Sequence, residues 1–313
     1  MKKLFFFLLM LSSTAQAQMR RPVLHDSLFS TYYHQRITLF KSLPQTAGDV
    51  IFIGNSITDG GEWSELFNDL RIKNRGISGD ISAGIVHRID EVVHRKPQKV
   101  FLMIGTNDLA RNITTDSLLK NIYWTVQLIQ QGSPSTRVFV QSILPVNEVY
   151  GKFGGHTSKG PQIKEVNRQL AQQAATKGYT YVDLYTPFSD AAGKLKKELT
   201  NDGLHLNGEA YLLWKHLIFP FVYNMETKPA LIPLPQNLAW QDGYFPLHAA
   251  TTIVVKHHEF KGEAEKLQTA LREKGLALKI ESTPKTGEPF IELVLGKVTA
   301  PQLAEEAYSL QVT

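Results

Sequence analysis

The sequence contains no cysteine, and this absence excludes disulfide scaffolds, thiol nucleophiles and thiolate metal sites together. It also has little excess charge, because 34 Lys and Arg residues stand against 29 Asp and Glu residues. Without basic clusters interleaved with aromatic residues, this composition gives no indication of nucleic-acid binding. No apolar run approaches the roughly 20 residues that a membrane-spanning helix requires. What is present, 42% hydrophobic and 20% charged residues, is typical of a folded globular protein.

The first residues have the pattern of a secretory signal peptide. Lys2 and Lys3 precede the apolar block 4–11, and small residues follow up to Ala17. A basic start, a short apolar core and a small-x-small ending predict cleavage after Ala17. We therefore expect residues 1–17 to direct export, with the periplasm, the cell surface and the medium all open as destinations. No cysteine follows the block, which argues against lipid attachment.

Residues 28–225 alternate between short apolar runs and longer amphipathic ones. This alternation predicts an α/β fold: a doubly wound, flavodoxin-like sheet of five parallel strands with helices on both faces. In such sheets, functional residues gather at the carboxyl ends of the strands. The expected strands are 50–54, 71–75, 99–104, 137–144 and 179–184, and the expected helices are 62–70, 82–94, 115–131, 161–176 and 207–223.

The remaining length predicts a second module. Residues 226–236 contain Pro229, Pro233 and Pro235, which together indicate a stiff linker. Residues 237–313 then predict a small α+β domain, with strands at 244–256, 277–282 and 290–295 and a helix at 259–274. The chain stops within a strand-like run at 308–312, so we expect this domain to be incomplete.

Three of the four segments that carry chemistry follow the first three expected strands. The first, GNSITDG (54–60), places Ser56 between a strand end and a helix start. The second, NRGISGD (74–80), contains Gly76 and Gly79, and the third, GTND (105–108), contains Asn107. A glycine N–H and an Asn carboxamide are suitable donors to an oxyanion. Each segment taken alone also fits ordinary capping or turn chemistry.

The fourth segment, NDGLHLN (201–207), precedes the last expected helix of the sheet domain. Its spacing lets the carboxylate of Asp202 hydrogen-bond one ring nitrogen of His205. The other ring nitrogen is then free to accept a proton from a serine. The alternative is a capping arrangement with a surface histidine.

Together the four segments, in the order Ser, Gly, Asn and Asp-x-x-His, resemble the SGNH (GDSL-like) hydrolase superfamily over about residues 30–225. The resemblance implies that Ser56 is the nucleophile, His205 the general base and Asp202 the residue that orients the imidazole. It implies an oxyanion hole made of the N–H of Ser56, the N–H of Gly79 and the side-chain amide of Asn107. Gly76, three residues before Gly79, is the alternative glycine donor. No metal or organic cofactor is implied.

One residue departs from the family pattern, because Asn55 stands where the family has Asp in Gly-Asp-Ser-Leu. An Asn keeps the shape and one acceptor, so we expect activity to survive. Segment 74–80, the helix after it and Lys96-Pro97 before 100–108 are most similar to the platelet-activating-factor acetylhydrolase-like branch. That branch includes bacterial sialate and other carbohydrate O-acetylesterases.

The resemblance therefore implies a secreted serine esterase that removes O-acetyl groups from carbohydrates, such as sialic acid or an N-acetylhexosamine. A lipid or short-chain acyl esterase is the first alternative, and a glycan-binding protein with a decayed catalytic site is the second. The oligomeric state is left open.

The second module resembles the N-terminal non-catalytic domain of family 20 β-hexosaminidases. The resemblance rests on LIPLPQ (231–236), Trp240, GYF (243–245) and EAYSL (306–310). In that family the domain precedes a barrel that carries the catalytic pair. No hexosaminidase site residues are present here, so no glycosidase activity is expected of this chain.

Overall fold

The computed structural model of the chain describes residues 29–46, 48–224, 251–273, 276–285 and 289–293. It divides into two compact units, residues 1–230 and 231–313, and each is described by itself. The predicted signal peptide, the predicted linker and the strand-like run at 308–312 lie outside the described residues. None of the described helices is both long and apolar enough to cross a membrane.

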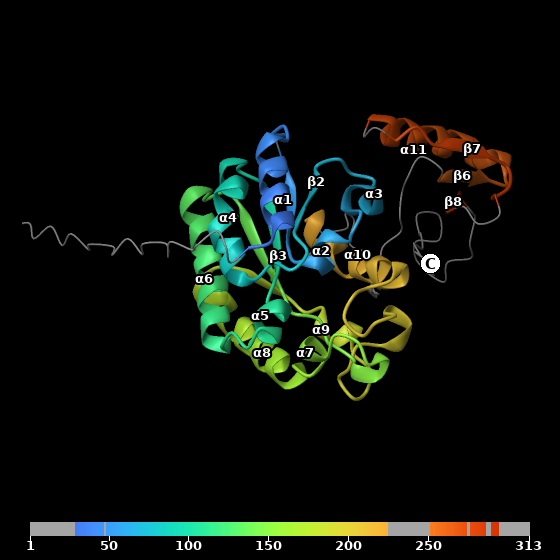
Figure 1. Ribbon diagram of the computed structural model, residues 1–313. Coiled ribbons are helices and arrows are strands. Elements are labelled where there is room, and N and C mark those ends of the chain that lie inside the picture. Colours follow the sequence, from blue (N-terminus) through green and yellow to red (C-terminus); the bar gives the residue numbers. More distant parts are fainter. Residues whose placement is uncertain (1–28, 47, 225–250, 274–275, 286–288, 294–313) are drawn as a thin grey trace, which may run out of the picture. The chain divides into compact units, whose positions relative to one another are not determined.

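The first unit is built on a parallel five-stranded sheet in the order β2-β1-β3-β4-β5 (Figure 1), which confirms the predicted fold class. Gly54 at the end of β1 pairs with Gly76 on one side and with Met103 on the other. Because these strands end in register, the segments that follow them meet at one edge of the sheet. The strands are β1 (Val50–Gly54), β2 (Ile72–Gly76), β3 (Lys99–Met103), β4 (Arg137–Gln141) and β5 (Thr180–Val182).

Helices cover both faces of this sheet (Figure 1). On one face α6 packs between α4 and α8, and α1 contacts α4; on the other, α3 contacts α10. The long helices are α1 (Thr31–Ser42), α4 (Ser82–His94), α6 (Thr115–Gly132), α8 (Gly160–Lys177) and α10 (Gly208–Val222). The short ones are α2 (Ser56–Asp59), α3 (Trp63–Phe67), α5 (Thr106–Ala110), η2 (Glu148–Tyr150), α7 (Gly154–Thr157), α9 (Tyr185–Phe188) and η3 (Lys197–Leu199).

A row of stacked aromatic rings crosses the centre of the sheet. Phe52, Phe101 and Phe139 are paired across β1, β3 and β4, and their ring centroids lie 4.9 and 4.6 Å apart. Trp63 of α3 stacks on Phe52 at 4.3 Å. A shift of one residue in any of these strands would turn its ring to the other face. The stack therefore stabilises the register that aligns the strand ends.

The observed element bounds differ from the predicted ones where local contacts end an element early. The helix predicted at 62–70 stops at Phe67, because Asn68 takes a left-handed conformation with φ 49°. The strand predicted at 137–144 stops at Gln141. The N–H of Ser142 makes a last backbone hydrogen bond to the carbonyl of Val182, and its side chain then accepts from the N–H groups of Leu184 and Tyr185.

The second unit contains a three-stranded parallel sheet in the order β7-β6-β8. Ile253, Ala264 and Leu278 form its buried core. Its described elements are β6 (Thr252–Val255), η4 (His258–Phe260), α11 (Lys261–Glu273), β7 (Lys279–Glu281) and β8 (Phe290–Leu293). The helix and strands match the predicted α+β pattern, although residues 244–250 of the first predicted strand lie outside the described residues.

Candidate active site

Ser56 is the first residue of α2, directly after β1. Asn55 caps this helix, because its Oδ1 accepts a hydrogen bond from the N–H of Ile57 at 3.1 Å. Capping requires an acceptor and no charge. The Asn that departs from the family pattern therefore holds the start of α2 as an Asp would.

Ser56, His205 and Asp202 form one hydrogen-bonded series, although 149 residues separate the serine from the histidine. Ser56 Oγ lies 3.1 Å from His205 Nε2, and His205 Nδ1 lies 2.8 Å from Asp202 Oδ2. The side chain of His205 is 36% exposed, whereas that of Asp202 is 14% exposed. The imidazole is therefore open to a ligand from outside while the carboxylate stays behind it.

Hydrogen bonds keep the Asp202 carboxylate ionised. Burial raises its pKa, but the hydrogen bond from the His205 ring and those from the N–H groups of His205 and Leu204 lower it more. The net pKa lies below the usual value for Asp. An ionised carboxylate at this position favours the tautomer with a proton on His205 Nδ1. Nε2 is then left as an acceptor for the Ser56 hydroxyl.

The structure separates the two candidate glycines of segment 74–80. The N–H of Gly76 donates to Asn74 Oδ1 at 2.7 Å, and a Cβ at Gly76 would lie 2.1 Å from the N of Asp59. Gly79 has φ +80° and open space where a Cβ would stand. Among the described residues, its N–H has no hydrogen-bond acceptor. Gly76 is thus required by close packing, whereas the N–H of Gly79 is available to donate to a ligand.

Asn107 lies in the first turn of α5 and is 7% exposed. Its Nδ2 donates to the carbonyl of Asp80 at 2.8 Å, which joins the segment after β3 to the segment after β2. A carboxamide has two N–H donors, so one remains for a ligand. The segment after β2 is also joined to α2, because the N–H of Ser78 donates to Asp59 Oδ2 at 3.1 Å.

Two buried carboxylates, those of Asp80 and Asp108, hold the segments that contain Gly79 and Asn107 in place. Asp80 Oδ2 accepts from Arg88 Nε at 2.9 Å, and both oxygens of Asp108 accept from the N–H of Ser82 at 3.0 Å. Burial raises the pKa of each carboxyl group to about 6, against the hydrogen bonds that lower it. These groups attach the segments around Gly79 and Asn107 to the start of α4.

His156 of α7 is a site residue that the sequence interpretation missed. Its Nε2 lies 2.9 Å from Asn107 Oδ1. The ring of Phe153, just before α7, packs edge-on against the rings of His156 and His205. The ring centroids lie 5.9 and 5.1 Å apart, respectively. The only signal in the sequence is a Gly-Gly-His segment that follows the fourth strand, at the edge where site residues gather.

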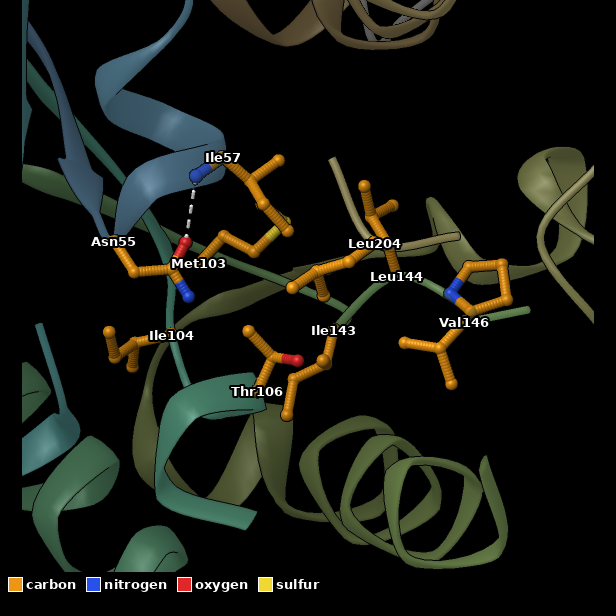
Figure 2. A pocket seen from close by; sticks show the side chains of 10 residues that line it. Asn55, Ile57, Met103, Ile104, Thr106, Ile143, Leu144, Val146 and Leu204 are labelled. Carbon is orange, nitrogen blue, oxygen red and sulfur yellow. Dashed lines mark hydrogen bonds between the residues drawn. The ribbon is translucent and has the colours of Figure 1, made fainter. Parts of the chain in front are cut away.

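A small, mainly apolar cavity lies among residues of the segments that follow β1, β3 and β4 and of the segment 201–207 (Figure 2). Its volume is about 10 Å³, which is room for about one water-sized group. Three of its lining residues, Ile57, Thr106 and Leu204, are sequence neighbours of Ser56, Asn107 and His205. Figure 2 shows Ile57 above the cavity, with Thr106 and Ile143 below it. All ten lining residues are buried, and Ser56, Asn107 and His205 are not among them, so the cavity lies in the interior next to the segments that carry these three residues.

The arrangement offers a hydroxyl with an adjacent base, and N–H donors beside it. These are the components of nucleophilic acyl transfer. Among the described residues, no group of three or more His, Asp and Glu side chains is arranged to hold a metal ion.

Comparison with known proteins agrees with this geometry. Residues 52–213, just over half of the chain, match the model of the GDSL-like lipase/acylhydrolase family. The chain belongs to this family. It is 30% identical over 174 residues to platelet-activating factor acetylhydrolase IB subunit alpha1 of Rattus norvegicus, covering 52% of this chain and 70% of that protein. It also resembles the structure of a GDSL-like lipase from Bacteroides thetaiotaomicron, with a TM-score of 0.55, 26% identity, and coverage of 62% and 98% of the two chains.

Two further similarities concern other classes of protein. The chain is 26% identical over 195 residues to an N-acylneuraminate cytidylyltransferase of Escherichia coli, covering 60% of this chain and 44% of that protein. Residues 228–313 match glycosyl hydrolase family 20, domain 2. An ester-hydrolysing domain is thus joined in one chain to a domain of a glycosidase family.

Proposed function

We propose that this protein is an exported serine esterase that removes O-acetyl groups from carbohydrates, sialic acids in particular, through an acetyl-serine intermediate. The observation that carries the proposal is the series from Ser56 through His205 to Asp202, with the free N–H groups of Gly79 and Asn107 in the adjoining segments. Export rests on the signal-peptide pattern of residues 1–17.

In the first half of the reaction, Ser56 Oγ attacks the carbonyl carbon of the acetyl ester. His205 Nε2 takes the hydroxyl proton, and Asp202 stabilises the imidazolium. The carbonyl oxygen becomes an oxyanion that accepts from the N–H groups of Ser56 and Gly79 and from Asn107 Nδ2. His205 then gives its proton to the sugar oxygen, which leaves as an alcohol, and the acetyl group stays on Ser56.

In the second half, a water molecule attacks the acetyl carbonyl while His205 takes one of its protons. The same three donors hold the second oxyanion. When this intermediate collapses, acetate leaves and the proton returns to Ser56 Oγ. Asp202 stays ionised throughout, in keeping with its lowered pKa.

Two observations support an acetyl group on a sugar. The cavity of about 10 Å³ between Ile57, Thr106 and Leu204 suits a methyl group and is too small for a long acyl chain. The similarity to an N-acylneuraminate cytidylyltransferase and the match to a glycosyl hydrolase domain favour a carbohydrate, with sialic acid first. The similarity to a platelet-activating factor acetylhydrolase supports a lipid acetyl ester as the competing substrate.

The test is release of acetate from O-acetylated sialosides, acetylated hexosamines, acetylated xylan and platelet-activating factor, with the wild type and Ser56→Ala in parallel. We expect the highest kcat/KM on an O-acetylated sialoside and loss of nearly all activity in Ser56→Ala. Activity confined to xylan, or highest on platelet-activating factor, would overturn the sialic-acid assignment. Wild-type rates in Ser56→Ala, or no labelling of the wild type by a fluorophosphonate probe, would overturn the serine mechanism.

A further inference from the structure

The carboxamide of Asn107 is useful to an oxyanion only in one of its two orientations. With Nδ2 toward the site it offers an N–H, but after a half-turn about its last bond it would present a carbonyl oxygen and repel negative charge. Its Nδ2 donates to the carbonyl of Asp80, and its Oδ1 lies 2.9 Å from His156 Nε2. Asp80 O can only accept. If His156 Nε2 carries a proton, it donates to Asn107 Oδ1, while Asp80 O accepts from Asn107 Nδ2. The two contacts then favour the same orientation of the carboxamide, the one with Nδ2 toward the site.

The surroundings of His156 favour a neutral ring that donates through Nε2. Burial lowers the pKa of His156, and the charges of His205 and Arg111 lower it further. Arg111 also donates from Nη2 to the carbonyl of Gly79 at 2.9 Å. Its positive charge is therefore held near the site, where it disfavours a second positive charge on His156. A neutral imidazole carries a proton on one nitrogen only, and the contact with a carbonyl oxygen requires that proton on Nε2.

The backbone around His156 holds the ring in place. The N–H of His156 donates to the carbonyl of Phe153 at 2.7 Å, and that of Lys159 donates to the carbonyl of His156 at 3.0 Å. The ring of Phe153 packs edge-on against His156 and His205. One aromatic side chain thus contacts both histidines, and His156 is held by the short helix it belongs to.

We propose that His156 is a positioning residue for the oxyanion hole. It donates from Nε2 to Asn107 Oδ1 and so keeps the second Nδ2 proton of Asn107 aimed at the oxyanion that forms on the substrate. His156 does not touch the substrate and exchanges no proton with it. This inference rests on the proposed serine-esterase function, in which Asn107 stabilises negative charge that develops after Ser56 attacks.

The experiment is a double-mutant cycle on p-nitrophenyl acetate with the wild type, His156→Leu, Asn107→Ala and the double variant. Loss of an oxyanion donor costs on the order of 10²–10³ in turnover, so we expect loss of its orientation to cost about 10–100-fold in kcat. KM should stay within about twofold, because the donor acts on charge that forms in the transition state. In the Asn107→Ala background, His156→Leu should change kcat less than about twofold, because no carboxamide remains to be oriented.

A second pair of variants keeps the test independent of folding changes in His156→Leu. The amide of Gln reaches about as far as Nε2 of His, whereas the amide of Asn is too short. We expect His156→Gln to retain most of the wild-type kcat and His156→Asn to lose as much as His156→Leu, with equal melting temperatures for the pair.

Equal losses for His156→Leu in both Asn107 backgrounds would overturn the proposal, as would equal activity of His156→Gln and His156→Asn. The Ser56→Ala variant, measured in the same assay, distinguishes this failure from failure of the proposed function. If Ser56→Ala is inactive and the cycle is additive, the serine mechanism holds and His156 has no positioning role. If Ser56→Ala is active, both proposals are wrong.

Discussion

Asp202 binds His205 twice, once through the ring and once through the backbone. Its Oδ2 lies 2.8 Å from His205 Nδ1, while its Oδ1 accepts from the N–H of His205 at 2.8 Å. The three-residue spacing makes this possible, because the chain turns back within one short segment. One carboxylate thus fixes the position of the histidine and the tautomer of its ring.

This double role predicts that Asp202→Asn removes activity without unfolding the protein. The Asn oxygen can keep the backbone contacts, but its amide can only donate to Nδ1 of His205. That contact puts the ring proton on Nε2, where it blocks acceptance from Ser56. We expect kcat on p-nitrophenyl acetate to fall about 10³–10⁴-fold, with the melting temperature nearly unchanged.

The matched control for this variant is Asp183→Asn. Asp183 is exposed, and it also accepts a backbone N–H through Oδ1, from Thr186 at 3.1 Å. Its replacement should leave kcat within about twofold, as is usual for surface positions outside a site. If Asp202→Asn kept a tenth or more of the wild-type kcat, the role given to Asp202 would be wrong.

The two glycines of segment 74–80 should respond oppositely to alanine. Gly76→Ala places a Cβ 2.1 Å from the N of Asp59, so the backbone must shift and the melting temperature should fall steeply. Gly79→Ala meets no atom within 4 Å, but its φ of +80° costs roughly 1–2 kcal/mol for a residue with a Cβ. Relief of this strain would turn the free N–H away from the site.

We therefore expect Gly79→Ala to remain folded and lose about 10-fold or more in kcat, since a displaced oxyanion donor acts mainly on turnover. Thermal unfolding and steady-state kinetics on the same samples separate the two effects. Full activity in Gly79→Ala together with a folded, inactive Gly76→Ala would reverse the assignment of the donor.

The parallel sheet was predictable from the sequence, and the structure brings together Ser56, His205 and Asp202, which the sequence singled out as site candidates. Strand ends in a parallel sheet meet at one edge, so segments recognisable one by one along the chain could be assembled without coordinates. The choice of Gly79 over Gly76 was not predictable. It depends on the Asn74 side chain, which accepts the Gly76 N–H.

Contacts between distant segments explain what else the sequence could not reveal. His156 reaches Asn107 across 49 residues, and neither residue type nor spacing marks the pair. Residues 142–144 were predicted as the end of the fourth strand. Instead the strand ends at Gln141, and Ile143 and Leu144 line the buried cavity. An apolar run predicts burial, but it does not say whether the partner is a strand or a cavity.

The raised pKa of Asp108 predicts how stability depends on pH. Its pKa is about 6 in the folded protein against an ordinary value of 3.8, because burial disfavours the charged form. Well below pH 4 the carboxyl is protonated in both states, and well above pH 6 it is ionised in both. The contribution of Asp108 to stability is therefore full at low pH and falls by up to roughly 3 kcal/mol as the pH rises between these limits.

Comparison with Asp108→Asn removes this group from the titration, together with the part of the Asp80 pKa shift that the charge of Asp108 causes. The amide does not ionise, so the free energy of unfolding of the wild type should decline relative to that of the variant between pH 4 and pH 6. Above about pH 7.5 the difference should be constant, because the carboxyl is then ionised in both states. Urea unfolding at intervals of half a pH unit measures the free energy of unfolding of both proteins. If these free energies changed with pH in parallel over the whole range, the raised pKa of Asp108 would be contradicted.

Under the proposed function, the cavity lined by Ile57 predicts the preference for acyl length. Ile57 lines the cavity and follows Ser56 in the sequence. Its carbonyl accepts from the Tyr211 hydroxyl at 2.8 Å, so a change of side chain leaves that backbone contact in place. Ile57→Ala enlarges the space where the acyl group would lie. We expect the ratio of kcat/KM for p-nitrophenyl butyrate to that for the acetate to rise about 10-fold or more, since each buried methylene contributes on the order of 1 kcal/mol.

The control for loss of stability is Ile53→Ala, a fully buried residue of β1 that does not line the cavity. Both variants remove the same atoms from the core, at a cost of about 2–5 kcal/mol in the free energy of unfolding. Only Ile57→Ala should change the ratio of the two esters. Because a ratio is insensitive to the fraction of folded enzyme, an equal change in both variants would mean that the acyl group binds elsewhere, and the cavity would then carry no acetyl preference.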